Sequence, residues 1–132
     1  MGVKYRTTLE TGRCIAGYRG GTNDNLTLYT GTSLNDNRFG NKSVRKADLL
    51  NVDYEVSINK DYLTVDGVTT PVNCTVTFTT TGNILIGAWN KDTNRFNGRF
   101  YYFYMKKNGV KILDLVPVKV ENIGYMFDLV TR

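Results

Sequence analysis

The residues of this chain that could do chemistry are carboxylates, amides and aromatic rings, because the sequence contains no histidine. The usual general base, the Ser-His and Cys-His nucleophile pairs and most zinc sites are therefore ruled out. The two cysteines, Cys14 and Cys74, are far apart and form no CxxC pair, which excludes a metal knuckle or a redox motif. Both occur in strand-like surroundings, so we expect buried free thiols, with a disulfide as the alternative.

A sugar-binding arrangement is the most developed chemical pattern in the sequence. Sugars are held by an aromatic plane together with hydrogen bonds from amides and carboxylates, and the chain has nine tyrosines and one tryptophan. The tryptophan begins an amide-rich loop after a predicted strand, and Tyr18, Tyr29 and Tyr102 are further aromatic candidates. The alternative is that these rings pack in the core or on a sheet face. The predicted carbohydrate-binding residues are Trp89, Asn90, Asp92, Asn94 and Arg95.

Three loop aspartates raise the question of a calcium site. Asp24 lies in GGTNDN, Asp36 lies in LNDNR, and Asp92 lies in the loop after the tryptophan. Calcium takes about six to eight oxygen ligands, several of them charged, in one constellation. Each of these loops supplies one carboxylate, and loops rich in Asn and Asp are mostly turns. We therefore expect no cofactor and no metal, with Ca²⁺ as the alternative.

The elements that must position these residues are strands, because hydrophobic residues recur with a period of two and no helical pattern is found. DYEVSIN, for example, places Tyr54, Val56 and Ile58 on one face of a strand, and a tight turn at Asp66-Gly67 follows in the same predicted hairpin. We predict a long loop over residues 34–50, in which residues 43–50 could hold a helical turn. The predicted strands are residues 4–9, 13–18, 26–30, 54–58, 63–65, 74–79, 83–89, 98–105, 112–119 and 125–130.

Two predicted strands are apolar on both faces, namely NILIGAW and RFYYFYM. Such strands lie centrally in a sheet or present one aromatic face as a binding surface. Many short strands, punctuated by thirteen glycines and two prolines, are typical of a sandwich or barrel. At 132 residues we expect a single domain, residues 1–132. The predicted core includes Phe78, Ile86, Phe103, Leu115 and Phe127.

The composition argues against a membrane or a nucleic acid as the partner of this chain. With 41% hydrophobic and 22% charged residues the chain is globular in type, and no apolar run is long enough to span a bilayer. The charged first ten residues contain no apolar h-region, so we expect no signal peptide and no membrane insertion. The net charge of +5 suggests a nucleic-acid partner, but the basic residues are scattered along the sequence rather than clustered in one patch. RFYYFY lacks the Lys/Arg-Gly-Phe-Gly-Phe pattern of an RNA-binding strand, so no nucleic-acid partner is expected.

A series of motifs runs through the C-terminal half of the sequence, namely Gly87-Ala88, 90–94, Phe96-Asn97-Gly98-Arg99, 114–118 and 124–128. In these motifs the sequence resembles LamG-like, concanavalin A-like jelly-roll domains, which are common in phage and gut-bacterial surface proteins. The resemblance covers residues 83–130 and is looser over residues 53–78. It implies an all-β, antiparallel jelly-roll sandwich. The chain departs from the family in having no opening Tyr-Ile-Asp/Asn-Thr-Gly strand and no further Phe-containing strand after Asp128, so we expect the first and last strands of the family to be lacking.

Catalysis is not expected. The glucanases of this superfamily carry Glu-x-Asp-x-x-Glu on one strand, and retaining hydrolysis needs two carboxyl groups about 5 Å apart. The nearest counterpart here is Asp53-Tyr54-Glu55, but Glu55 faces water and no third carboxylate follows at the required spacing. The resemblance therefore implies a non-enzymatic module of a virion or of an extracellular cell surface, used for attachment, decoration or glycan recognition. The alternative is a purely structural assembly subunit without a ligand.

The end of the sequence, ILDLVPVKVENIGYMFDLV, suggests an interaction edge. Pro117 cannot donate a ladder hydrogen bond, so its strand must be an edge or be bulged. Asp114 lies among apolar neighbours and needs hydrogen-bond partners, and Gly124 is expected to let the chain turn back. Unpaired apolar strands are a template for another chain. We therefore expect a homo-oligomer or a larger particle, with the C-terminal strands at the contact.

Overall fold

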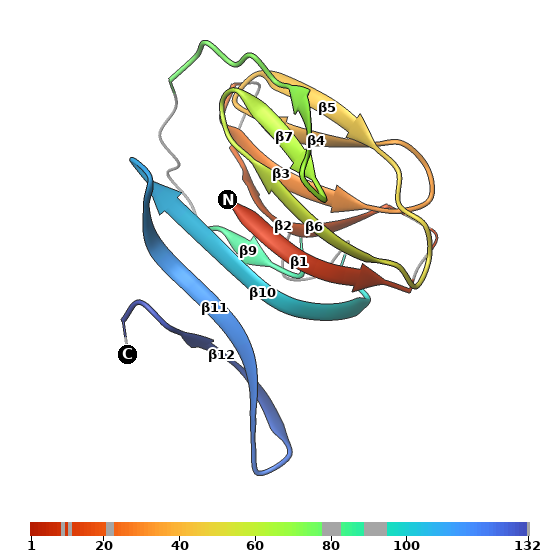
Figure 1. The fold of residues 1–132 in the computed structure, drawn as a ribbon, viewed down its shortest axis with the longest axis vertical. Helices are drawn as coiled ribbons and strands as arrows, with labels where there is room; N and C mark the ends of the chain where they lie inside the picture. Colours follow the sequence, from red (N-terminus) through yellow and green to blue (C-terminus); the bar gives the residue numbers. More distant parts are fainter. Residues whose placement is uncertain (9, 11, 21–22, 78–82, 89–94, 132) are drawn as a thin grey trace.

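The computed structural model describes residues 1–8, 10, 12–20, 23–77, 83–88 and 95–131. Two antiparallel sheets pack face to face as a β-sandwich, and the described residues contain no helix (Figure 1). The all-β, antiparallel sandwich predicted from the sequence is thus confirmed. The described part of the chain accordingly contains no helix that could span a membrane.

The larger sheet has seven strands in the order β12-β11-β10-β1-β6-β7-β8, and the smaller has five in the order β5-β4-β3-β2-β9. Strands of the larger sheet are β1 (Gly2–Thr7), β6 (Asp53–Ile58), β7 (Tyr62–Val65), β8 (Val68–Pro71), β10 (Gly98–Lys107), β11 (Val110–Val120) and β12 (Ile123–Asp128). Those of the smaller sheet are β2 (Arg13–Arg19), β3 (Asn25–Thr30), β4 (Asn35–Phe39), β5 (Lys42–Lys46) and β9 (Leu85–Ile86).

Three hairpins of the larger sheet close through two-residue turns. Asp66-Gly67 joins β7 to β8, Asn108-Gly109 joins β10 to β11, and Glu121-Asn122 joins β11 to β12. All six residues have positive φ, between 48° and 84°. A turn of this kind matches the right-handed twist of the strands it connects. The predicted turn at Asp66-Gly67 is confirmed, whereas Gly124 does not make the turn assigned to it and lies inside β12 opposite Lys119.

The predicted loop over residues 34–50 is wrong in part, because it contains the β4–β5 hairpin. The hairpin was not predicted because its sequence is polar, and polar residues are usually taken as loop residues. Asn37 is nevertheless fully buried in β4, and hydrogen bonds satisfy its side chain. Its Oδ1 accepts from the backbone N–H of Tyr29 at 2.8 Å, and its Nδ2 donates to the Asn35 carbonyl at 3.2 Å. Residues 43–46 belong to β5 rather than to a helical turn.

Two other predicted strands are also corrected. Residues 74–77 alternate as predicted but have no ladder partner among the described residues, and the rest of that segment lies outside them. Within the described part of NILIGAW, residues 83–88, only β9 forms, at the edge of the smaller sheet rather than at a sheet centre. RFYYFYM does lie inside the larger sheet, as β10 between β1 and β11. The remaining predicted strands are present, with shifted ends.

The core lies between the sheets and is built from the inward residues of β1, β2, β3, β6 and β10. The alternation predicted for β6 is confirmed, with Val56 and Ile58 buried and Glu55 exposed. Of the predicted core residues, Phe103 is fully buried, and Ile86 and Leu115 are half-buried against the core. Phe127 is 46% exposed, so its assignment was wrong, and Phe78 lies outside the described residues. The largest buried hydrophobic side chains are Tyr5, Phe103, Ile15, Leu28, Ile58 and Leu63.

A polar cluster is buried inside this core. Lys46, at the end of β5, forms an ion pair with Asp48, and their side chains are only 7% and 0% exposed. The Tyr5 hydroxyl donates to Asp48 Oδ2 at 2.6 Å and accepts from Lys46 Nζ at 2.6 Å. The ammonium also lies 5.4 Å from the ring centres of Tyr5 and Tyr54. Burial lowers the pKa of Lys46 and raises that of Tyr5, and the Asp48 carboxylate opposes the first shift and adds to the second.

Both cysteines are free and buried, as expected. Cys14 is 0% and Cys74 is 6% exposed. Burial raises the pKa of the Cys14 thiol to about 12, so the reactive thiolate is not formed at neutral pH. These residues are packing elements.

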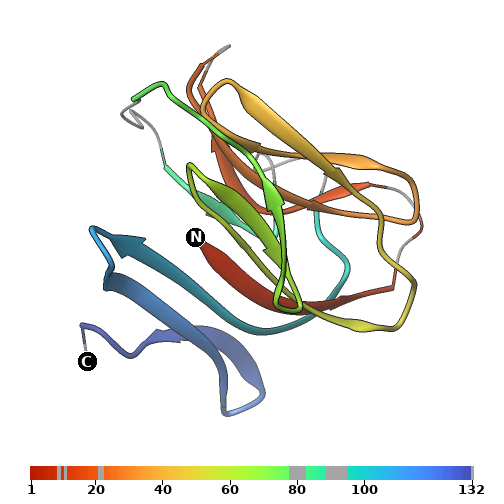
Figure 2. The same cartoon turned by 45° about the horizontal axis from the view of Figure 1, so that its top comes forward.

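The β11–β12 hairpin extends beyond the sandwich, away from the smaller sheet (Figures 1 and 2). In the strand order β11 lies between β10 and β12, but the ladder between β10 and β11 ends at Phe103–Leu115. Among the described residues, β11 is therefore paired at Pro117 with β12 alone, and its other side is an edge at that point, as the proline predicts. Asp114 has the partner it needed, because Lys111 Nζ lies 2.7 Å from its Oδ2.

Candidate functional site

Most of the sequence-predicted sugar site falls on residues that the structure does not describe. Trp89, Asn90, Asp92 and Asn94 lie outside the described residues, and Arg95 is exposed. The stem of this loop is defined: the Gly87 N–H donates to the Ile15 carbonyl at 2.6 Å, and the Phe96 N–H donates to the Gly87 carbonyl at 2.6 Å. The loop location therefore stays a prediction.

The three additional tyrosine candidates are not brought together. Tyr18 lies on β2 and Tyr29 on β3, both in the smaller sheet, whereas Tyr102 lies on β10 in the larger sheet. Tyr102 lies among the tyrosines and charged side chains of the outer face of the larger sheet.

The outer face of the larger sheet gathers tyrosines, carboxylates and cations. Strand register explains this, because Gly2 pairs with Tyr104 and Lys4 pairs with Tyr102 between β1 and β10, while Lys4 pairs with Glu55 between β1 and β6. Residues paired across antiparallel strands share a face. A register shift between Lys4 and Tyr5 also turns Tyr101 toward this face. We call it the tyrosine face; its residues are Lys4, Arg6, Asp53, Glu55, Tyr101, Tyr102 and Tyr104.

One end of the tyrosine face is organised by Asp53. Arg6 Nε lies 2.6 Å from Asp53 Oδ1, and the Tyr101 hydroxyl donates to the same oxygen at 2.9 Å. The hydrogen bond from Arg6 holds the pKa of Asp53 below its ordinary value, and the Tyr101 hydrogen bond contributes in the same direction. The Lys4 ammonium lies 5.8 Å from the centre of the Tyr101 ring. Asp53 is therefore a fixed anion at neutral pH.

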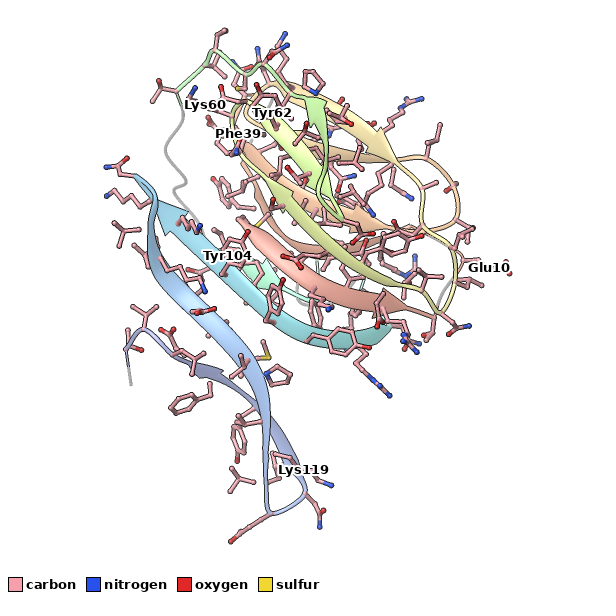
Figure 3. All side chains as sticks on the ribbon, in the orientation of Figure 1. Glu10, Phe39, Lys60, Tyr62, Tyr104 and Lys119 are labelled. Carbon is pink, nitrogen blue, oxygen red and sulfur yellow. The ribbon has the colours of Figure 1, made fainter. Side chains whose placement is uncertain are left out.

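The centre of the face carries two neighbouring rings. Tyr102 and Tyr104 have ring centres 6.3 Å apart and planes inclined by 28°. Burial raises the pKa of Tyr102, and a hydrogen bond to Glu55 raises it further, so the hydroxyl stays protonated as a donor. Tyr104, labelled on β10 in Figure 3, lies against Gly2, where a Cβ would come within 2.4 Å of its ring. Glycine at this position thus leaves room for the ring over β1.

A hollow of about 530 Å³ lies on the same face. It is lined by side chains of β1, β6 and β7 and by the β7–β8 turn. Asp66 Oδ1 accepts the backbone N–H of Glu55 at 2.7 Å, which fixes the turn against β6. The hollow thus offers hydroxyl, carboxylate and ammonium groups, and the hydrogen bond between Tyr102 and Glu55 connects it to the ring pair. Its lining residues are Lys4, Asp53, Glu55, Ser57, Thr64, Asp66 and Gly67.

Among the residues that the structure describes, no three carboxylates or thiols form a group that could hold a metal ion. Asp36, one of the calcium candidates, pairs with Arg38 at 3.2 Å and with Arg45 at 3.1 Å. Asp24 is half-buried beside the β2–β3 connection, and Asp92 lies outside the described residues. Asp36 is therefore a structural anion.

Comparison with known proteins gives no match: no protein-family model, no curated protein and no solved structure is significantly similar to the chain.

The sequence carries a signal for the tyrosine face, although the predicted site around Trp89 does not include it. RFYYFYM is apolar on both faces, which predicts a candidate aromatic surface, and Asp53 and Glu55 share one face of their strand. The pattern does not show that β1 pairs with both β10 and β6 and so joins the two groups. This long-range pairing cannot be derived from local alternation.

Proposed function

We propose that this chain is a non-enzymatic glycan-recognition module, with the tyrosine face as its binding surface. The observation that carries the proposal is the Tyr102–Tyr104 pair beside a polar hollow on a rigid sheet. Flat aromatic surfaces next to oriented carboxylates and hydroxyls suit sugars, which have one apolar face and many hydroxyl groups.

The geometry assigns different parts of the sugar to the rings and to the hollow. The apolar face of a sugar ring stacks on Tyr102 and Tyr104, and its hydroxyl groups bond to Glu55, Ser57 and Asp66 in the hollow. The rings are already held by Gly2 and Glu55 in the free chain. Little side-chain entropy is then lost on binding.

The same geometry favours binding over hydrolysis. A glycosidase needs one carboxylic acid whose pKa is raised so that it can protonate the leaving group. Asp53 has the opposite property, because Arg6 and Tyr101 hold it as an anion. Glu55 is engaged by the Tyr102 hydroxyl.

The strand pairing supports a jelly roll of the concanavalin A-like type. β1 pairs with β10, and β2 pairs with β9, so N-terminal and C-terminal strands are nested in both sheets. Together with the sequence resemblance, this supports a module of a phage particle or of a bacterial surface protein.

A glycan array followed by titration of the best oligosaccharide tests the proposal. Tyr102→Ala and Tyr104→Ala should each weaken binding by about threefold to tenfold, as expected for the loss of an aromatic contact worth ~1 kcal/mol. Tyr62→Ala is the matched control, because Tyr62 is a 47% exposed tyrosine on β7 of the same sheet, outside the tyrosine face.

If neither substitution changes the affinity for the sugar, the tyrosine face is not the binding site. Fluorescence of Trp89, the single tryptophan, then tests the loop over residues 89–95 as the site. If the chain binds no glycan at all, the proposed function itself is rejected.

A purely structural assembly role is the second candidate. One observation favours it: large hydrophobic side chains are exposed along the β11–β12 hairpin.

A further inference from the structure

The β11–β12 hairpin exposes much apolar surface. Ile123 is 58%, Tyr125 51% and Phe127 46% exposed. The register pairs Val116 with Phe127 and Val118 with Tyr125, so a continuous apolar strip runs along one face of the hairpin. The large hydrophobic residues exposed on the hairpin and just after it are Val110, Ile112, Val120, Ile123, Tyr125, Met126, Phe127, Leu129 and Val130.

The outer edge of β12 is also open among the described residues, since β12 pairs only with β11. In a hairpin with a two-residue turn the pair that closes the turn, here Val120–Ile123, is hydrogen-bonded, and every second pair follows suit. The N–H and C=O groups of Gly124 and Met126 therefore point to the open edge. A Cβ added at Gly124 would meet nothing within 4 Å.

The opposite edge of the larger sheet is different. β8 is only four residues long and ends in Pro71, which has no N–H to donate. Short edge strands with proline are a recognised protection against pairing with another chain. β12 has six residues, no proline, and Asp128 as its single charged residue. The two edges of one sheet are thus unequal.

We propose that β12 pairs antiparallel with β12 of a second copy of this chain, with Tyr125 on the two-fold axis. In this register Gly124 faces Met126 of the other copy, and four backbone hydrogen bonds form from the groups that are open in the single chain. Ile123 faces Phe127, and Tyr125 faces Tyr125. Asp128 faces Asn122 and Glu121 faces Leu129, so no like charges are opposed.

The second copy is the occupant that the character of the edge favours. In the register above Ile123 faces Phe127, Tyr125 faces Tyr125 and no like charges are opposed. The edge is therefore self-complementary in hydrophobicity and charge, as a two-fold interface requires.

The pairing has a consequence for glycan binding, which rests on the proposed function. A two-fold axis perpendicular to the sheet makes one continuous sheet of fourteen strands, with both tyrosine faces on the same side. Two sites facing one surface gain avidity, which matters most when each site is weak.

Sedimentation equilibrium from micromolar to submillimolar concentration tests the pairing. Wild type is expected to reach twice the 14.9 kDa chain mass. Tyr125→Lys places two ammonium groups together on the axis, and Met126→Pro removes two edge N–H donors without touching the β11 ladder. Each should raise the dimer dissociation constant at least tenfold. Tyr62→Lys, on β7 near the protected edge, should leave it unchanged.

Wild type that stays monomeric throughout, or both β12 variants dimerising as wild type does, would overturn the pairing. The glycan function has a separate readout, because a monomeric Tyr125→Lys chain should keep its single-site affinity and lose binding strength only on glycan-coated surfaces. A dimer without any glycan binding would reject the proposed function and leave the pairing intact.

Discussion

The sandwich and the β11–β12 hairpin treat polar and apolar groups in opposite ways. The sandwich buries a lysine, an aspartate and a tyrosine hydroxyl, all mutually hydrogen-bonded. The hairpin exposes Tyr125 as well as Ile123 and Phe127, whose residue types are among those most often found inside proteins. Burying a charge requires partners within the chain, and the sandwich provides them. The described residues leave the apolar strip of the hairpin exposed, and our proposal assigns its partner to a second copy.

β10 lies between the closed core of the sandwich and the exposed β11–β12 hairpin. Its inner face carries Phe103, which is fully buried and pairs across the ladder with Leu115 on β11. Beyond Leu115 the strand β11 continues without β10; Pro117, Lys119 and Val120 are exposed there, and Val116 and Val118 are half-buried. Figure 3 shows Lys119 near the far end of the hairpin, remote from Tyr104. The change from closed core to open surface thus occurs within a single strand.

The largest contrast is expected between two phenylalanines. Phe103→Ala should lower the free energy of unfolding by about 3–5 kcal/mol, because it leaves a cavity in a packed core. Phe127→Ala should lower it by less than about 1 kcal/mol, since nearly half of this ring is already exposed. Chemical denaturation of both variants at a concentration where the wild type is monomeric measures the difference. Equal losses would mean that the hairpin is as closed as the sandwich.

The buried polar cluster should give an effect of similar or slightly smaller size. Lys46→Met leaves Asp48 buried without its cation, which typically costs about 3–5 kcal/mol, reduced here by the Tyr5 hydroxyl that still donates. Arg45→Met is the matched control, because Arg45 is 69% exposed on the same strand and its pair with Asp36 is worth at most about 1 kcal/mol. Thermal denaturation should separate the two. A Lys46→Met chain as stable as Arg45→Met would contradict the role given to the cluster.

The smallest expected effect concerns Asp53 on the tyrosine face. Its folded-state pKa lies below the ordinary value of 3.8, so its ion pair with Arg6 is fully present above that pH and is lost as the pH falls through the folded-state pKa. Melting temperature should therefore decrease slightly more in wild type than in Asp53→Asn as the pH is lowered below 3.8. An identical acid profile for the two chains would show that the pair contributes nothing.

Much of this fold could be predicted from the pattern of apolar and polar residues along the sequence. Apolar residues at every second position predicted β1, β2, β3, β6 and β7, a run that is apolar on both faces predicted β10, and Asp66-Gly67 predicted its turn. The β4–β5 hairpin was not predicted because Asn37 and Lys46 are buried polar residues, whose partners Tyr29 and Tyr5 lie on other strands. Phe127 was misassigned because an apolar strand in a core and an apolar strand at an interface have the same pattern.

The candidate site was less predictable than the fold. The residues first chosen, around Trp89, share a local sequence pattern, whereas Lys4, Glu55 and Tyr102 come from three strands far apart in sequence. Their assembly depends on the position of β1 between β10 and β6. Strand order in a sheet is set by the packing of the whole chain, which local patterns do not encode.

Amide hydrogen exchange as a function of protein concentration tests most directly whether the hairpin is completed by a second copy. Exchange at Gly124 and Met126 should slow as the concentration rises, because their N–H groups become hydrogen-bonded only in the dimer. Tyr125, already bonded to β11, and Val3, in the middle of the larger sheet, should change much less. Exchange rates at Gly124 and Met126 that do not depend on concentration would contradict the account.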